Sequence, residues 1–149
     1  MAKFVYRMQN ILDIKQKLER QAKADYGLAN AKLIEEQQKL QKIIVQKSGY
    51  ENRARELVSG SICVNDIREN KRAIESMKVI MRRQLQEVQN AERQVEAARA
   101  RLQEIMTDRK THEKLKEHAF EAYMLEQGQE ENKIVDELVS YTYHEKEEE

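Results

Sequence analysis

The side chains that could carry out chemistry are few and lie far apart in the sequence. Three histidines (His112, His118 and His144) and one cysteine (Cys63) are the candidates for a metal site or a nucleophile. His112 and His118 fall on different faces of a helix, and no histidine lies near Cys63 in the sequence. No two glycines are close enough to form a phosphate-binding loop. We therefore expect no enzymatic activity, no cofactor and no metal site.

The composition limits the elements that could position any functional side chain. The 149 residues include no proline and no tryptophan; 36% are charged and 5% are aromatic. Such a chain has too few turn residues for a sandwich, a barrel or a repeating βα fold, and too few large side chains for a globular core. The composition is typical of long helices that form a coiled coil.

Charge is balanced overall but unevenly distributed along the chain. The first 60 residues carry 12 basic and 7 acidic groups, whereas residues 130–149 carry 2 and 8. The two ends are expected to differ in electrostatic role, although a solvated tail would have the same composition. The arginines of Arg93–Arg101 surround Glu96 and no aromatic residue lies among them, so we expect a solvated helix face and no nucleic-acid partner.

No segment has the apolar length of a signal peptide or of a membrane span. The single cysteine excludes an internal disulfide. We therefore expect a cytoplasmic protein with no direct membrane insertion.

Apolar residues in the first part of the chain recur at alternating intervals of three and four, the period of a coiled coil. Only Lys15, Glu36 and Lys47 interrupt this row with polar side chains. Two consecutive four-residue steps, at Leu18, Ala22 and Tyr26, predict a local unwinding of the supercoil. The predicted inward-facing row is Phe4, Met8, Ile11, Lys15, Leu18, Ala22, Tyr26, Ala29, Leu33, Glu36, Leu40, Ile43, Lys47, Tyr50, Ala54 and Leu57.

The segment Ser59-Gly60-Ser61 predicts a helix end and a turn, and Asn65-Asp66 favours the start of a second helix. A seven-residue repeat follows, made of Ile67, Ile74, Met81, Val88, Val95 and Leu102. The companion row that we predict for it holds Val64, Leu85 and Met106 but also Lys71, Lys78, Glu92 and Arg99. This mixture predicts a loosely packed, hydrated interface.

The predicted fold is all-α: two long helices in an antiparallel coiled-coil hairpin, with the second helix longer and overhanging. The boundaries are helix one at about 3–58, a turn at about 59–63, helix two at about 64–143 and an acidic frayed tail at 144–149, all within one domain, 1–149. If Leu57 lies near Val64, Phe4 lies near residue 117, and 118–143 has no partner within the chain. An uncovered apolar stripe there indicates an interaction surface, although folding back, disorder or a homodimer would also account for it.

Three segments resemble a known family. The chain begins Phe4-Val5-Tyr6-Arg7-Met8-Gln9-Asn10-Ile11-Leu12, has Gly60-Ser61-Ile62-Cys63-Val64-Asn65-Asp66-Ile67 at the turn, and ends with Asn132-Lys133-Ile134-Val135-Asp136-Glu137-Leu138 and Tyr141. These segments are similar to the corresponding parts of the flagellar export protein FliJ family. In length and layout, the resemblance covers nearly the whole chain. Cys63 stands where that family usually has a hydroxyl residue, and Val139 and Ser140 depart from its small residue.

The resemblance implies a coiled coil similar to the central stalk of rotary ATPases, acting in bacterial flagellar type III secretion at the cytoplasmic face of the inner membrane. The implied partners are the flagellar export ATPase ring, which the protein would stimulate, the cytoplasmic domain of the membrane export gate, and substrate-specific export chaperones.

Residue by residue, the resemblance and the exposed stripe together give two sets of candidate contacts. The expected ATPase-binding residues are Phe4, Tyr6, Arg7, Met8, Gln9, Asp136, Glu137, Leu138 and Tyr141. The expected gate-binding region holds Ile67, Ile74 and Met81, which also fit the intramolecular row. A generic coiled-coil scaffold, or the equivalent stalk protein of an injectisome, is the alternative.

Overall fold

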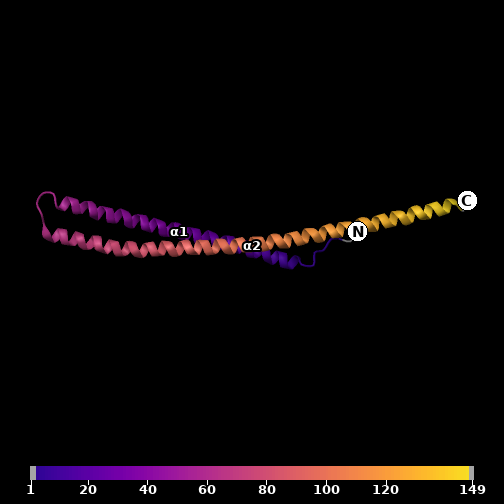
Figure 1. Ribbon diagram of the computed structural model, residues 1–149, viewed down its shortest axis with the longest axis horizontal. Coiled ribbons are helices and arrows are strands. Elements are labelled where there is room, and N and C mark those ends of the chain that lie inside the picture. The colour runs from indigo at the N-terminus through magenta and orange to yellow at the C-terminus, as the bar shows by residue number, and fades with distance from the viewer. Residues whose placement is uncertain (1–2, 148–149) are drawn as a thin grey trace. The chain divides into compact units, whose positions relative to one another are not determined.

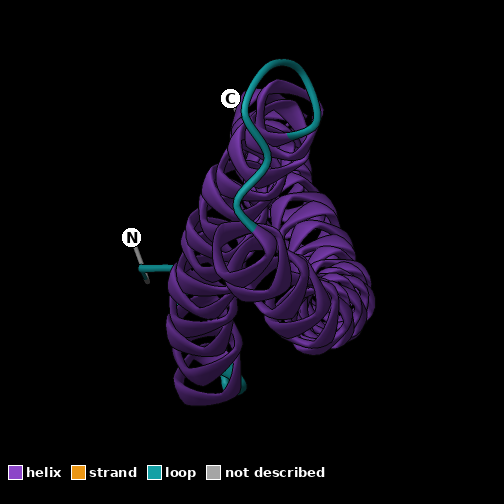
Figure 2. Ribbon diagram, turned by 90° about the vertical axis from the view of Figure 1, so that its left-hand side faces the viewer, coloured by secondary structure: helices purple, strands orange, loops and turns teal. Residues whose placement is uncertain are grey.

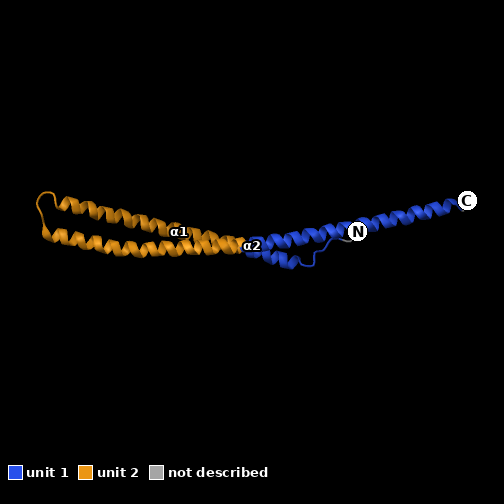
Figure 3. Ribbon diagram, viewed as in Figure 1, with its two compact units in different colours: residues 1–19, 104–149 blue, residues 20–103 orange. Residues whose placement is uncertain are grey.

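The computed structural model describes residues 3–147 and contains two helices, α1 (Gln9–Leu57) and α2 (Val64–Glu147), as Figure 1 shows. Apart from the segment before α1 and the turn between the helices, the described chain is helical throughout (Figure 2). The all-α prediction, with a longer second helix packed on the first, is confirmed. Contacts divide the chain into unit 1 (residues 1–19 and 104–149) and unit 2 (residues 20–103), each with parts of both helices (Figure 3).

The helix bounds differ from expectation at both termini. Residues 3–8 precede α1, which begins at Gln9 rather than near residue 3, and the Met8 carbonyl accepts hydrogen bonds from the amides of Ile11 (3.0 Å) and Leu12 (3.1 Å). At the other end α2 continues through 144–147, which we expected to fray. Its last turn holds His144 and Lys146, whose basic groups suit the negative end of the helix dipole, but also Glu145 and Glu147, whose carboxylates oppose it. Residues 148–149 of the predicted tail lie outside the described residues.

The turn between the helices depends on one glycine. Gly60 has φ of 98°, and no other described residue has a positive φ. The amide and the hydroxyl of Ser59 both donate to the Glu56 carbonyl, at 3.2 and 3.0 Å, and so satisfy an acceptor at the end of α1. The Cys63 carbonyl accepts from the Ile67 amide at 3.2 Å and begins α2.

In unit 2 the predicted repeat from Ile67 to Leu102 is buried or half-buried against α1, but its predicted companion row is wrong. Val64 and Leu85 are exposed, whereas the row one position earlier is buried or half-buried; it holds Asn70, Met77, Gln84, Ala91 and Ala98. Hydrogen bonds explain why α2 presents this earlier row to α1. The Asn70 side-chain amide donates to the Tyr50 carbonyl at 3.0 Å, and that of Gln84 donates to the Glu36 carbonyl at 2.9 Å and to its carboxylate at 2.5 Å.

In unit 1 the inward-facing residue near the start of α1 is Leu12, which is 2% exposed, and not the predicted Ile11, which is 42% exposed. Both precede Lys15 by about one helical turn, and a repeat of 3.6 residues leaves either able to face α2. The predicted Met8 is also exposed, because it lies before the helix.

Phe4 contacts Phe120 and Tyr123, a few residues beyond the predicted position 117. The non-helical segment before Gln9 explains this shift, because an extended residue advances about 3.3 Å and a helical one only about 1.5 Å. Beyond this contact, every described residue from 129 to 147 is exposed. The expected overhang is therefore present, as a continuous helix.

The glycines provide a matched test of the turn. Gly60→Ala should lower the free energy of unfolding by about 1 kcal/mol, because alanine resists a positive φ. Gly27→Ala should raise it by about 0.5–1 kcal/mol, because Gly27 is exposed within α1 and a Cβ there meets nothing within 4 Å. Urea unfolding followed by circular dichroism measures both. Equal effects of the same sign would contradict this account of the turn.

Candidate partner-binding surface

An aromatic cluster lies where the N-terminal segment meets α2. The Phe4 ring lies 5.2 Å from Phe120 in an edge-to-face arrangement and 5.3 Å from Tyr123, and the two α2 rings are 6.4 Å apart. Phe120 and Tyr123 are three residues apart, so that one helix face presents both to Phe4. Phe4 is consequently half-buried within the chain itself.

The other N-terminal candidates differ in how accessible they are. Tyr6 is half-buried, and its hydroxyl oxygen is enclosed without a hydrogen-bond partner. Gln9 is half-buried and donates to the Asp13 carboxylate at 2.8 Å. Arg7 and Met8 are exposed. Within this predicted set, Arg7 and Met8 are therefore the side chains most available to a partner.

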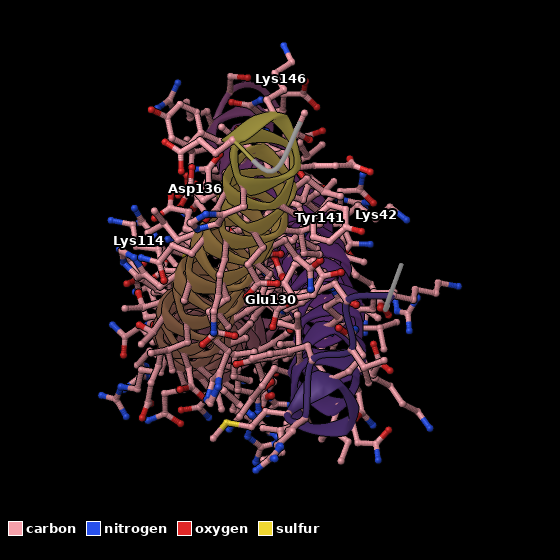
Figure 4. All side chains as sticks on the ribbon, turned by 90° about the vertical axis from the view of Figure 1, so that its right-hand side faces the viewer. Lys42, Lys114, Glu130, Asp136, Tyr141 and Lys146 are labelled. Atoms are coloured by element: carbon pink, nitrogen blue, oxygen red, sulfur yellow. The ribbon has the colours of Figure 1, made fainter. Side chains whose placement is uncertain are left out.

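The distal candidates lie on the exposed part of α2. Leu138 (60% exposed) and Tyr141 (69%) share one face with Ile134 (57%), at intervals of four and three residues. Asp136 lies on the opposite side from Leu138, since two residues turn a helix by about 200°. Figure 4 shows Asp136 and Tyr141 on different sides of α2. Glu137 is exposed beside the apolar face.

A shallow groove of about 370 Å³ accompanies this face. Its lining combines apolar side chains with two hydroxyl groups and one ammonium group: Val135, Leu138, Val139, Thr142, Tyr143 and Lys146. An open groove of this kind suits the side chains of another protein better than a small molecule, which prefers an enclosed cavity.

The two halves of the predicted site are not brought together, but Leu138 and Tyr141 lie on the side of α2 that receives Phe4. Asp136 lies 13 residues beyond Tyr123, about 20 Å along the helix. Eighteen residues, or about five helical turns, separate Phe120 from Leu138 and likewise Tyr123 from Tyr141. The side of α2 that receives Phe4 is therefore also the side of the exposed row Ile134, Leu138 and Tyr141, although the polar Gln127 and Glu131 lie between them.

Unit 1 also contains a cluster of charges between its helices. Lys15 Nζ lies 2.6 Å from the Asp108 carboxylate, and Arg109 forms an ion pair with Glu19. On α2 itself, Arg109 Nη1 lies 2.8 Å from Glu113, and His112 Nε2 lies 3.6 Å from Asp108. The sequence analysis missed this cluster, although the signal was present: Lys15 interrupts the apolar row of α1, and charged residues replace the α2 repeat after Met106.

These contacts shift two pKa values. The hydrogen bond from Lys15, followed by its charge, lowers the pKa of the Asp108 carboxyl. The hydrogen bond to Glu113, together with the charges of Glu113 and Glu19, raises the pKa of Arg109. Both groups therefore stay charged at neutral pH, and the cluster acts as a set of ion pairs rather than as an acid or a base.

The gate-binding candidates Ile67, Ile74 and Met81 are half-buried in the interface between the helices of unit 2. Ile67 and Ile74 also line a groove of about 200 Å³ beside the turn, with Ala54, Leu57, Val58, Asn70 and Lys71. Close to it in sequence, Val58, Ile62 and Val64 are exposed. Part of this predicted set is thus accessible at the turn, although the same side chains pack the hairpin.

Within residues 3–147, no group of three or more histidine, cysteine or acidic side chains is arranged to hold a metal ion. Neither described helix has an apolar stretch long and uncharged enough to span a membrane.

The ion pair at Asp108 predicts a pH dependence. Because Lys15 holds the Asp108 pKa below its ordinary value, the pair stabilises the fold above about pH 4, and this contribution is lost as the pH falls through the lowered pKa. Asp108→Asn should therefore lower the melting temperature near pH 6 and have a smaller effect near about pH 2. Asp25→Asn, at an exposed position of α1, is the control. A destabilisation by Asp108→Asn that is the same at both pH values would contradict the assignment.

Comparison with known proteins identifies the family. A family model described as the flagellar FliJ protein matches residues 4–148, which include both sets of candidate contacts. No curated protein and no solved structure matches the chain. The family match covers almost the entire sequence and agrees with the two-helix fold. The chain therefore belongs to the flagellar FliJ family, which places it among the structural components of the flagellar export apparatus.

Proposed function

We propose that this protein is the stalk of the flagellar export ATPase ring and stimulates ATP hydrolysis through the terminal part of unit 1. The observation that carries the proposal is the apolar row Ile134, Leu138 and Tyr141, which no part of the described chain covers. An exposed row of large side chains on a continuous helix is a surface for another protein.

The chemistry of this surface indicates what the ring would present. Leu138 and Tyr141 are the hydrophobic anchors, because large side chains that become buried dominate interface energies. Residues 130–149 carry 8 acidic and 2 basic groups, so the ring surface that receives α2 would be basic. Asp136 and Glu137 would contact such basic groups, while Arg7 would pair with an acidic one. Phe4, Tyr6, Met8 and Gln9 would complete the surface nearer the N-terminus.

The turn end of unit 2 is the proposed contact for the export gate. Ile67 and Ile74 line the groove beside the turn, and the exposed Val58, Ile62 and Val64 add apolar area nearby in sequence. Met81, one repeat further along, would extend this contact. Working at the cytoplasmic face of the inner membrane, the protein would also pass emptied substrate chaperones to the apparatus.

The charge of α2 favours this proposal over a coiled-coil scaffold that pairs with itself. A homodimer through the exposed row would bring two strongly acidic segments together, which opposes association. The flagellar family match favours the flagellar ATPase over that of an injectisome.

The test is hydrolysis by the cognate flagellar export ATPase, titrated with this protein. We expect saturable stimulation at well below one copy per ATPase subunit, as one stalk per ring requires. Leu138→Ala and Tyr141→Ala should each weaken the interaction by about 1–3 kcal/mol, the usual cost of truncating an interface anchor. Helix content should stay unchanged, because both side chains are exposed.

Leu125→Ala is the matched control, since Leu125 is 67% exposed on α2 but lies about 140° around the helix from Leu138. The Leu125→Ala variant should stimulate ATP hydrolysis as strongly as the unaltered protein does. If the folded protein gives no stimulation, the stalk assignment is wrong. If Leu125→Ala is impaired as strongly as Leu138→Ala, the assigned face is wrong.

A further inference from the structure

The ion pairs of unit 1 have an unusual property: each charge that crosses between the helices has an alternative partner on its own helix. Asp108 contacts Lys15 across the interface and lies 3.6 Å from His112 Nε2 within α2, a contact that is an ion pair only when His112 is protonated. Arg109 contacts Glu19 across the interface and Glu113 within α2. Lys15 and Glu19 lie four residues apart on α1, the spacing at which opposite charges pair along a helix.

Separation of the two helices in unit 1 would therefore leave Lys15, Glu19 and Arg109 each with an oppositely charged neighbour, and Asp108 beside His112. The cross-helix pairs Lys15–Asp108 and Glu19–Arg109 would be exchanged for Lys15–Glu19 and Arg109–Glu113. A buried charge that loses its only partner is costly, whereas exchange of one ion pair for another costs less, even for Glu19, which is buried between the helices. This cluster positions the two helices without binding them tightly.

Apolar burial in unit 1 is also slight. Leu12, at 2% exposed, is the one buried apolar residue of this unit within the described chain. Unit 2 has five buried apolar residues: Ala22, Met77, Val88, Ala91 and Val95. Unit 2 is further held by the bonds from the Asn70 and Gln84 amides to α1 carbonyls. The boundary between the units falls at Glu19–Arg20, within the Leu18–Ala22–Tyr26 step where the heptad pattern predicts local unwinding.

We infer that residues 3–19 form a releasable arm, which separates from α2 by exchange of these ion pairs while unit 2 stays closed. Release takes Phe4 off Phe120 and Tyr123 and exposes these rings on the same side of α2 as the row of Ile134, Leu138 and Tyr141. The arm thereby regulates how much of α2 is available to a partner. In that role the inference rests on the proposed function, but release itself is a property of the free chain.

A single tryptophan can report release, because the natural sequence contains none. Phe4→Trp places the probe in the aromatic cluster, and quenching by acrylamide measures how often it reaches solvent. In this background Asp108→Asn should increase quenching about two- to fivefold, because it removes the cross-helix ion pair with Lys15.

Glu113→Gln should have the opposite effect and reduce quenching. It removes the partner that Arg109 keeps after release, and it relieves the repulsion between Glu113 and Glu19 at one guanidinium group while the arm is bound. Glu51→Gln removes a comparable charge from the Lys47–Glu51 pair of unit 2 and should leave quenching unchanged.

The opposite effects of Asp108→Asn and Glu113→Gln on quenching distinguish the exchange of ion pairs from a cluster that only holds the arm in place. If every ion pair simply held the arm in place, both unit 1 variants would increase quenching, and that result would overturn the inference. Unchanged quenching in either variant would overturn it as well. Should Phe4→Trp disturb the cluster, amide hydrogen exchange across residues 10–18 of Asp108→Asn and Glu113→Gln in the natural background gives the same comparison. All of these measurements use the free chain, so their failure would leave the ATPase proposal untouched.

Discussion

The hydrogen bonds from the Asn70 and Gln84 side chains to main-chain carbonyls of α1 are the contacts on which the rest of the structure depends. An apolar coiled-coil interface tolerates a shift of register, because one aliphatic layer resembles the next. A side-chain amide that hydrogen-bonds to one particular carbonyl does not tolerate such a shift of register, because an amide left unpaired in that interface is costly. These two residues select the face that α2 presents to α1, at the expense of a row with more large apolar side chains.

With the register of unit 2 fixed, the lengths of the two helices decide what remains uncovered. α1 has 49 residues and α2 has 84, so a long C-terminal part of α2 has no intramolecular partner. In unit 1, Phe4 meets Phe120 and Tyr123, and α2 continues from there with its apolar face exposed. Apolar burial is slight in unit 1 and greater in unit 2.

Much of this fold could be predicted from the sequence, because the coiled-coil period, the glycine turn and the absence of proline all indicate a hairpin. The companion row of α2 could not be predicted from the sequence, because apolar content favours the row of Leu85 whereas hydrogen bonding selects the row of Gln84. The start of α1 was missed because its row of apolar residues extends back to Phe4 without a helix. The candidate site was anticipated as two sets of residues; the placement of Leu138 and Tyr141 on the side of α2 that receives Phe4 required the position of Phe4, and the charged cluster of unit 1 required both helices in place.

The most direct test of the account is amide hydrogen exchange of the full chain, with and without its cognate export ATPase. The account predicts slower exchange across residues 129–147 of the bound chain and unchanged exchange across residues 58–74, which surround the turn. Protection of 58–74 with none across 129–147 would contradict it, because the turn end of unit 2 would then be the surface that the ATPase binds.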